Sequence, residues 1–126
     1  MATLAVLRHE EGVRFDPDRL LALYSDLGED AAEQVMCRAM EEIAGRLTEI
    51  QRLVDEGDGA ALHGSGRRLI AVTERVGMLT LARVTADVLR ATEAGDVVAQ
   101  AATLARLLRI ADRSLNAVWD APEFSL

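Results

Sequence analysis

The stretch that decides the fold runs over residues 29–56 and reads EDAAEQVMCRAMEEIAGRLTEIQRLVDE. It contains no proline, and charged residues such as Glu41, Glu42 and Arg52 fall mainly outside one repeating apolar stripe. The members of that stripe recur every three or four residues: Ala32, Val35, Met36, Ala39, Met40, Ile43, Leu47, Ile50 and Val54. This spacing is typical of an amphipathic helix that buries one face against other elements. We therefore predict one long helix over 29–56.

Four further helices are predicted around it. Asp16 before Pro17 is typical of an N-cap followed by proline in the first turn, and Gly28 ends that short helix. Glycines at positions 57, 77 and 95 separate three helices on the C-terminal side, with Asp58 and Asp96 as N-caps. Their expected buried stripes are Leu62, Leu69, Val72 and Val76; Leu81, Val84, Val88 and Leu89; and Val98, Ala101, Leu104, Leu108, Ala111, Leu115 and Val118.

Composition and connection length indicate the fold class. Half of the 126 residues are hydrophobic but only 3% are aromatic, which favours an aliphatic core between packed helices. Connections this short force neighbouring helices to run antiparallel. We predict an all-α fold, an antiparallel up-down-up-down four-helix bundle over residues 15–119 with the short N-terminal helix across one end. Residues 1–14 are expected to be an extension and 120–126 a tail.

The charged residues exclude several function classes. The chain has 14 Arg, no Lys and 21 acidic residues, and a net charge of −7 argues against a general nucleic-acid binder. Without lysine there is no Walker-type phosphate site and no Schiff-base chemistry. Cys37, the single cysteine, is expected to pack beside the 29–56 stripe, and with two histidines it cannot complete a Cys/His zinc site. We expect neither metal nor cofactor.

The hydropathy of the chain argues against a membrane location. No apolar run approaches the ~20 residues that cross a bilayer. The first residues, MATLAVLRH, lack the basic start and the small-residue cleavage site of an export signal. A cytoplasmic protein is the expectation.

The segment 62–68, LHGSGRR, is unusual for a helix. Gly64 and Gly66 each cost about 1 kcal/mol relative to alanine, so a close approach to a neighbour is expected there. Residues 60–90 carry five Arg against two acids, whereas residues 1–59 carry six Arg against 14 acids. On a helix, one ridge holds His63, Arg67 and Glu74, and the next holds Arg68 and Arg75. If the segment binds no ligand, these two ridges are an ordinary solvent-exposed helix face whose charged side chains form ion pairs.

The order of these parts resembles the histidine-containing phosphotransfer (HPt) domain of bacterial two-component phosphorelays, over about residues 15–118. The lead-in FDPDRLL at 15–21, the Gly57-Asp58 pair and Leu62 are similar to the family pattern. The resemblance implies a four-helix bundle with a short leading helix. It also implies a phosphate-accepting His nine residues after Asp58 and ten before Gly77, which is the position of Arg67.

The motif departs from the family in its chemical residues. In that register Leu69 matches the family leucine, but Arg67 replaces the His, Ile70 the Lys and Ala71 the Gly. A guanidinium stays protonated and has no free nitrogen lone pair, so Arg67 cannot accept a phosphoryl group. The resemblance therefore favours a binding protein over an enzyme.

Three functions follow from the sequence. The first is an HPt-like module that binds a receiver domain or a histidine kinase, with Arg67 entering the acidic pocket that the resemblance implies for receivers. His63, Arg68 and Arg75 would form a basic rim, and Glu74 would orient an arginine. The second is phosphotransfer through His63, one turn before Arg67, with a displaced receiver. The third is a structural or assembly bundle unrelated to phosphorelays.

Overall fold

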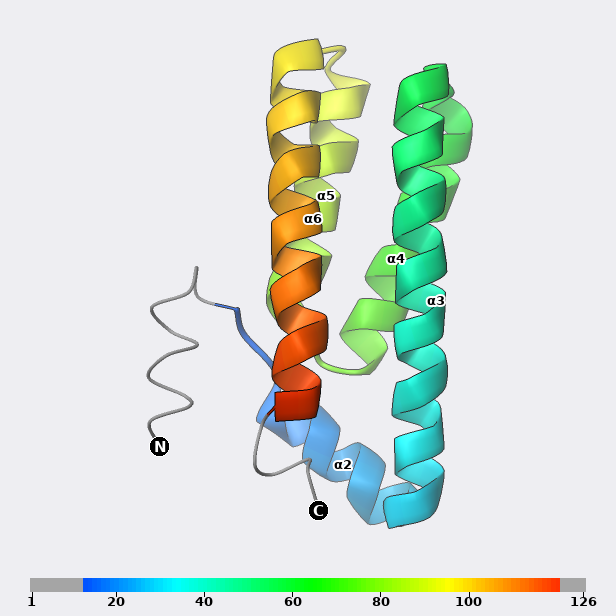
Figure 1. Ribbon diagram of the computed structural model, residues 1–126, viewed down its shortest axis with the longest axis vertical. Helices are drawn as coiled ribbons and strands as arrows, with labels where there is room; N and C mark the ends of the chain where they lie inside the picture. The colour runs from blue at the N-terminus through cyan, green and yellow to red at the C-terminus, as the bar shows by residue number, and fades with distance from the viewer. Residues whose placement is uncertain (1–12, 121–126) are drawn as a thin grey trace.

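The computed structural model describes residues 13–120 and the side chains of residues 13–117, and over that range it is helical (Figure 1). The helices are α2 (Pro17–Leu27), α3 (Glu29–Glu56), α4 (Gly59–Arg75), α5 (Leu79–Glu93) and α6 (Val97–Asp120). Within the described range, Phe15 and Met78 form an isolated antiparallel β-bridge. The all-α prediction is confirmed. Residues 1–12 of the expected extension and 121–126 of the expected tail lie outside the described residues.

The helix ends follow the predicted cap residues. The carboxylate of Asp16 accepts from the amides of Asp18 and Arg19 at the start of α2. Asp58 accepts from Ala61 N at 3.1 Å, and Asp96 accepts from Ala99 N at 3.0 Å. These bonds satisfy amides that have no partner inside the helix. A glycine with positive φ follows each of the first four predicted helices, at positions 28, 57, 77 and 95.

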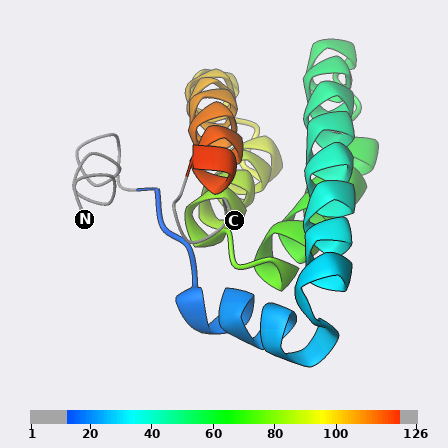
Figure 2. The ribbon, with the colours of Figure 1, turned by 60° about the horizontal axis from the view of Figure 1, so that its bottom comes forward.

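Each long helix packs on the next one in the chain. α3 lies on α4, α4 on α5 and α5 on α6, whereas α3 and α6 contact each other only slightly. Figures 1 and 2 show α2 below the ends of the longer helices, where it packs on the start of α3. The largest fully buried side chains are aliphatic: Ile43, Ile50, Leu62, Leu69, Met78, Leu81, Leu107, Ile110, Val72, Val76, Val84 and Val88.

The lead-in to α2 is bonded to the turn between α4 and α5. Asp16 N donates to Gly77 O at 2.7 Å, and Leu79 N donates to Arg14 O at 3.1 Å. Arg14 N donates to the hydroxyl of Thr80 at 2.7 Å. Gly77 has φ +77°, and a Cβ there would lie 3.0 Å from Asp16 O. The glycine is therefore required both by its backbone conformation and by this contact.

The predicted stripe of the last helix is partly wrong. Val98 and Ala101 are exposed, while Leu104, Leu108 and Leu115 are only half-buried. The fully buried positions of α6 are Leu107, Ile110, Ala111, Ser114 and Ala117. Two neighbouring stripes on this helix both follow the three-and-four spacing. Because α6 packs on α5 and hardly on α3, the predicted stripe lies at the edge of the core. Val118 lies beyond the described side chains.

Two smaller observations complete the comparison with the sequence. Cys37 is exposed, so its expected packing role is wrong, because it projects from α3 outside the buried stripe. Within residues 13–120, none of the helices combines the length and apolar character that a bilayer span requires.

Candidate functional site

The candidate site is the outer face of α4. His63, Arg67, Arg68, Ala71, Glu74 and Arg75 are all exposed there, and Ile70 is half-buried at its margin. The opposite face of the helix carries the core residues Leu62, Leu69 and Val72. The 3.6-residue period therefore separates the residues that hold α4 in the fold from those that face solvent.

The two unusual glycines of α4 have different structural roles. A Cβ on Gly66 would lie 2.6 Å from Cδ2 of Leu89, so the glycine lets α4 and α5 approach closely. A Cβ on Gly64 would meet no atom within 4 Å. The expected close approach is confirmed for Gly66 and wrong for Gly64, which lies on the solvent side of the helix.

His63 lies on the side of α4 that faces α5. Its Nδ1 is 3.4 Å from Oε1 of Glu93, and 48% and 64% of the two side chains are exposed. If the imidazole is protonated, the two groups form an ion pair between the start of α4 and the end of α5. Sequence reasoning missed Glu93, because it belongs to another helix and no local spacing links it to His63.

Arg68 lies on the side of α4 that faces α3. Its charge, together with those of Arg46 and Arg52, lowers the pKa of Glu49, after a larger effect from the Ser65 hydroxyl. That hydroxyl is buried and makes no hydrogen bond of good geometry, yet it lies close enough to stabilise the carboxylate. The two ridges of α4 therefore face two different neighbouring helices, and Glu49 is a second neighbour that the sequence did not predict.

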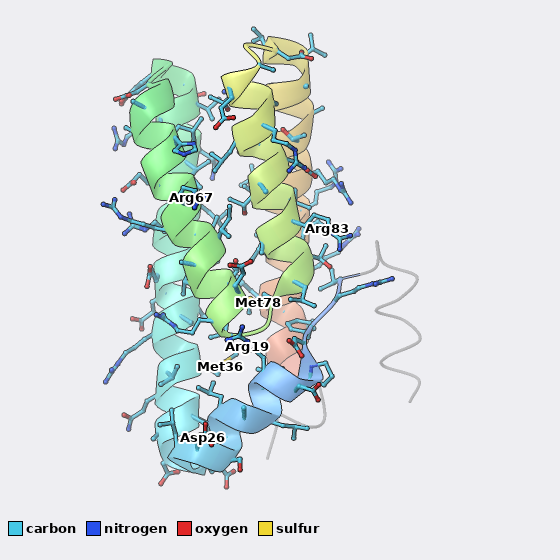
Figure 3. All side chains as sticks on the ribbon, turned by 180° about the vertical axis from the view of Figure 1, so that it is seen from behind. Arg19, Asp26, Met36, Arg67, Met78 and Arg83 are labelled. Atoms are coloured by element: carbon cyan, nitrogen blue, oxygen red, sulfur yellow. The ribbon has the colours of Figure 1, made fainter. Side chains whose placement is uncertain are left out.

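Arg67 lies halfway along α4, on the same ridge as His63 (Figure 3). Among the described residues it makes no ion pair, and neither do Arg68, Arg75 or Glu74. The ion pairs expected on a solvated face are thus missing from its centre, and within residues 13–117 Glu74 makes no ion pair with an arginine. The guanidinium of Arg67 keeps all its donors available to a partner.

The chemistry available on this face is recognition of anions. Three arginines on one helix surface attract carboxylates or phosphates, and Arg67 has no lone pair with which to accept a phosphoryl group. Among residues 13–120 there is no group of three or more His, Cys, Asp or Glu side chains arranged to hold a metal ion. A shallow depression lined by Glu33, Cys37 and Arg38 lies on α3 and includes none of the candidate residues.

Comparisons with known proteins gave no match to a family model, to a curated protein or to a solved structure.

Proposed function

We propose that this protein is an HPt-like signalling module that binds a receiver domain or a histidine kinase and accepts no phosphate at the usual position. The observation that carries the proposal is Arg67, which is exposed, unpaired among the described residues and central on the outer face of α4. It stands at the position where the resemblance implies the phosphate-accepting His. The proposal places the protein in the cytoplasm, as part of a two-component pathway.

The proposed architecture is an antiparallel four-helix bundle of α3, α4, α5 and α6 with α2 across one end. Packing of each helix on the next and the short turns at Gly57, Gly77 and Gly95 support it. The lead-in bonded to Gly77 also supports it, because it fixes α2 beneath the turn between α4 and α5.

Arg67 would recognise the partner through its charge. A guanidinium presents a planar fork of donors that matches a carboxylate in two parallel hydrogen bonds. In water an exposed Arg67 loses little by being unpaired, but in a closed interface with an acidic pocket its attraction increases as the effective dielectric falls. Arg68 and Arg75 would add long-range attraction, and Ile70 and Ala71 would contribute apolar contact next to the charge.

The test is a binding titration of the source organism's receiver domains against matched charge reversals. Arg67→Glu is compared with Arg38→Glu, which changes an exposed arginine of α3 that makes no ion pair among the described residues. We expect Arg67→Glu to weaken binding by at least about 30-fold, since losing one partner of a buried charge pair costs 2–5 kcal/mol. Arg38→Glu should leave affinity near that of the parent. Equal affinities of the two variants would contradict the role of Arg67.

A second candidate function is phosphoryl transfer through His63. The approach of its Nδ1 to Glu93 at 3.4 Å favours it, because a carboxylate at one ring nitrogen favours the tautomer that leaves the Nε2 lone pair free. The test is incubation with phosphoramidate followed by intact mass. An acid-labile phosphate that disappears in His63→Ala and persists in His9→Ala would support it. No phosphate, or one retained in His63→Ala, would contradict it.

A further inference from the structure

The chain enters the described structure beside the first turn of α5. Arg14 N donates to the hydroxyl of Thr80 at 2.7 Å, and Leu79 N donates to Arg14 O at 3.1 Å. Val13, one residue earlier, is buried in the core cluster. The preceding residues 1–12, MATLAVLRHEEG, therefore have a fixed attachment point on the fold.

The attachment point lies at the edge where α5 meets α6. The two helices run side by side in opposite directions (Figure 1), and Nη1 of Arg106 lies 3.9 Å from Oδ2 of Asp87. Arg113 is seven residues after Arg106, and Thr80 is seven residues before Asp87. Because each residue of a helix advances by about 1.5 Å, Arg113 lies at the level of Thr80.

The edge is basic at this level. Arg83 is exposed, projects from the side of α5 away from α4 (Figure 3) and makes no ion pair among the described residues. Arg109 and Arg113 lie on the neighbouring side of α6. Asp87, one turn after Arg83, already forms ion pairs with two arginines. Positive charge is therefore in excess here, in a protein with a net charge of −7.

Farther along α6 from the attachment point, the exposed side of the helix is apolar. Ala105, Ala102 and Val98 lie four, seven and eleven residues before Arg109, so the four residues form one stripe, which we call the α6 stripe. Its three apolar members are exposed, and the 81% exposure of Val98 is the highest among the large hydrophobic side chains of the described residues. Away from the attachment point, the surface is thus first basic and then apolar.

Residues 1–12 carry the complementary groups in the same order. Glu11 and Glu10, here called the acidic pair, lie three and four residues before Arg14, and the uncharged run ATLAVL occupies positions 2–7. Carboxylates pair with guanidinium groups, and apolar side chains are stabilised by covering exposed apolar surface. The segment that leaves the attachment point is therefore first acidic and then apolar.

We propose that residues 1–12 of this chain cover the α6 stripe, with the acidic pair at Arg83 and Arg109 and residues 2–7 over the apolar members. Exposed ion pairs contribute little alone, so the docking depends on the ion pairs and the apolar cover together. Because the segment is tied at the attachment point, it binds as part of the same molecule and needs less binding energy than a separate chain. α4 packs on α5 from a side that α6 does not occupy (Figure 3), so the outer face of α4 stays open and the proposal is independent of the function assigned to it.

The segment is long enough to reach. Four extended residues span up to about 13 Å, and Arg109 lies only about 6 Å along α6 from Arg113. Val98 lies about 22 Å along α6 from Arg113. Residues 2–7 can extend about 23–40 Å from Arg14, so they reach the apolar members of the stripe.

The first test locates residues 1–12 by nuclear magnetic resonance. In a Cys37→Ser background, a nitroxide spin label on Thr3→Cys should broaden the amide signals of residues 97–105 more than those near the attachment point. Broadening that is strongest near the attachment point would overturn the proposal. So would broadening of residues 97–105 in a mixture of spin-labelled protein with isotope-labelled protein that carries no spin label, because a second copy would then supply the segment.

Charge reversal tests the acidic pair. Arg83→Glu with Arg109→Glu should lower the docked-to-undocked ratio at least about threefold, because two attractive pairs become repulsive. Adding Glu10→Arg and Glu11→Arg to that variant should restore the broadening of residues 97–105. Arg38→Glu on α3 is the matched control and should leave it unchanged. Docking that survives the reversal on α5 and α6 would overturn the role of the acidic pair.

The reactivity of Val98→Cys tests the apolar cover. In the Cys37→Ser background, its thiol should react with a maleimide several-fold more slowly in the full chain than in a chain that lacks residues 1–11. Ala44→Cys, at an exposed position in the middle of α3, is the control and should react equally in both. The truncation removes none of the described residues, and circular dichroism checks that the helices are retained. Equal rates for Val98→Cys in the two chains would overturn the proposal.

Discussion

The inner and outer faces of α4 are constrained to very different degrees. On the inner face, Gly66 lies so close to Leu89 that one added carbon would overlap it, and Leu69 is fully buried. On the outer face, Gly64 has open space around it and Arg67 makes no ion pair among the described residues. The difference shows that core packing accounts for the residues on only one face of this helix. The residues on the other half are not packed into the core, so they are the ones available to a partner.

The largest expected effect comes from breaking the inner face. Gly66→Ala should destabilise the protein by about 1 kcal/mol, because overpacking of about 1–3 kcal/mol exceeds the roughly 1 kcal/mol that alanine adds in helix propensity. Denaturant unfolding of Gly66→Ala, Leu89→Ala and the double variant measures it. The double variant should be more stable than the sum of the two single changes predicts, since the shortened Leu89 makes room for the new methyl group. Simple additivity would argue against a direct contact.

The matched change on the outer face should have the opposite sign. Gly64→Ala should stabilise the protein by about 0.5–1 kcal/mol, because the new Cβ meets no atom and alanine reduces the entropy of the unfolded chain. The measurement is the same unfolding titration. If Gly64→Ala lost stability, the outer face would be packed against something, and the contrast between the two faces would fail.

The helix caps show what could be predicted from the sequence. Asp16, Asp58 and Asp96 bond amides two or three residues ahead, so the whole signal is local and readable along the chain. The long stripe of α3 was equally clear, because seven of its nine predicted positions are buried. Val35 and Val54 are half-buried, and the stripe missed the buried Leu53. These features were sufficient to predict five helices and their boundaries to within a few residues.

What failed depends on neighbours from distant parts of the sequence. The stripe chosen for α6 included Val98, which is exposed, because periodicity alone does not show that α3 hardly touches α6. The approach of His63 to Glu93 and of Ser65 to Glu49 joins different helices, and neither pair has a spacing signature. The charged residues of the outer face of α4 were predicted as a group, since they fall on two neighbouring ridges of one helix. Their missing ion pairs were not.

A smaller effect should distinguish the α3 side of α4 by its pH dependence. The Ser65 hydroxyl, followed by Arg46, Arg52 and Arg68, lowers the pKa of Glu49 in the folded protein below its ordinary value of 4.5. The ionised form is therefore favoured by folding, and this stabilisation is present above about pH 4.5 and is lost as the pH falls through the lowered pKa. Ser65→Ala should reduce the stability that the protein loses as Glu49 becomes protonated, without abolishing that loss, because the arginines remain. Ser114→Ala, another buried serine without a hydrogen-bond partner, is the control and should leave that loss unchanged.

The smallest expected effect on stability belongs to the residue with the largest proposed role. Arg67→Glu should change the free energy of unfolding by no more than about 0.5 kcal/mol, because the side chain is exposed and has no ion pair to lose among the described residues. Thermal and denaturant unfolding of this variant and of Arg38→Glu measure it. A large loss of stability would mean that Arg67 supports the fold, and weaker receiver binding by the variant would then say nothing about recognition. Unchanged stability with lost binding separates the two roles, since only a contact made outside the chain produces both results.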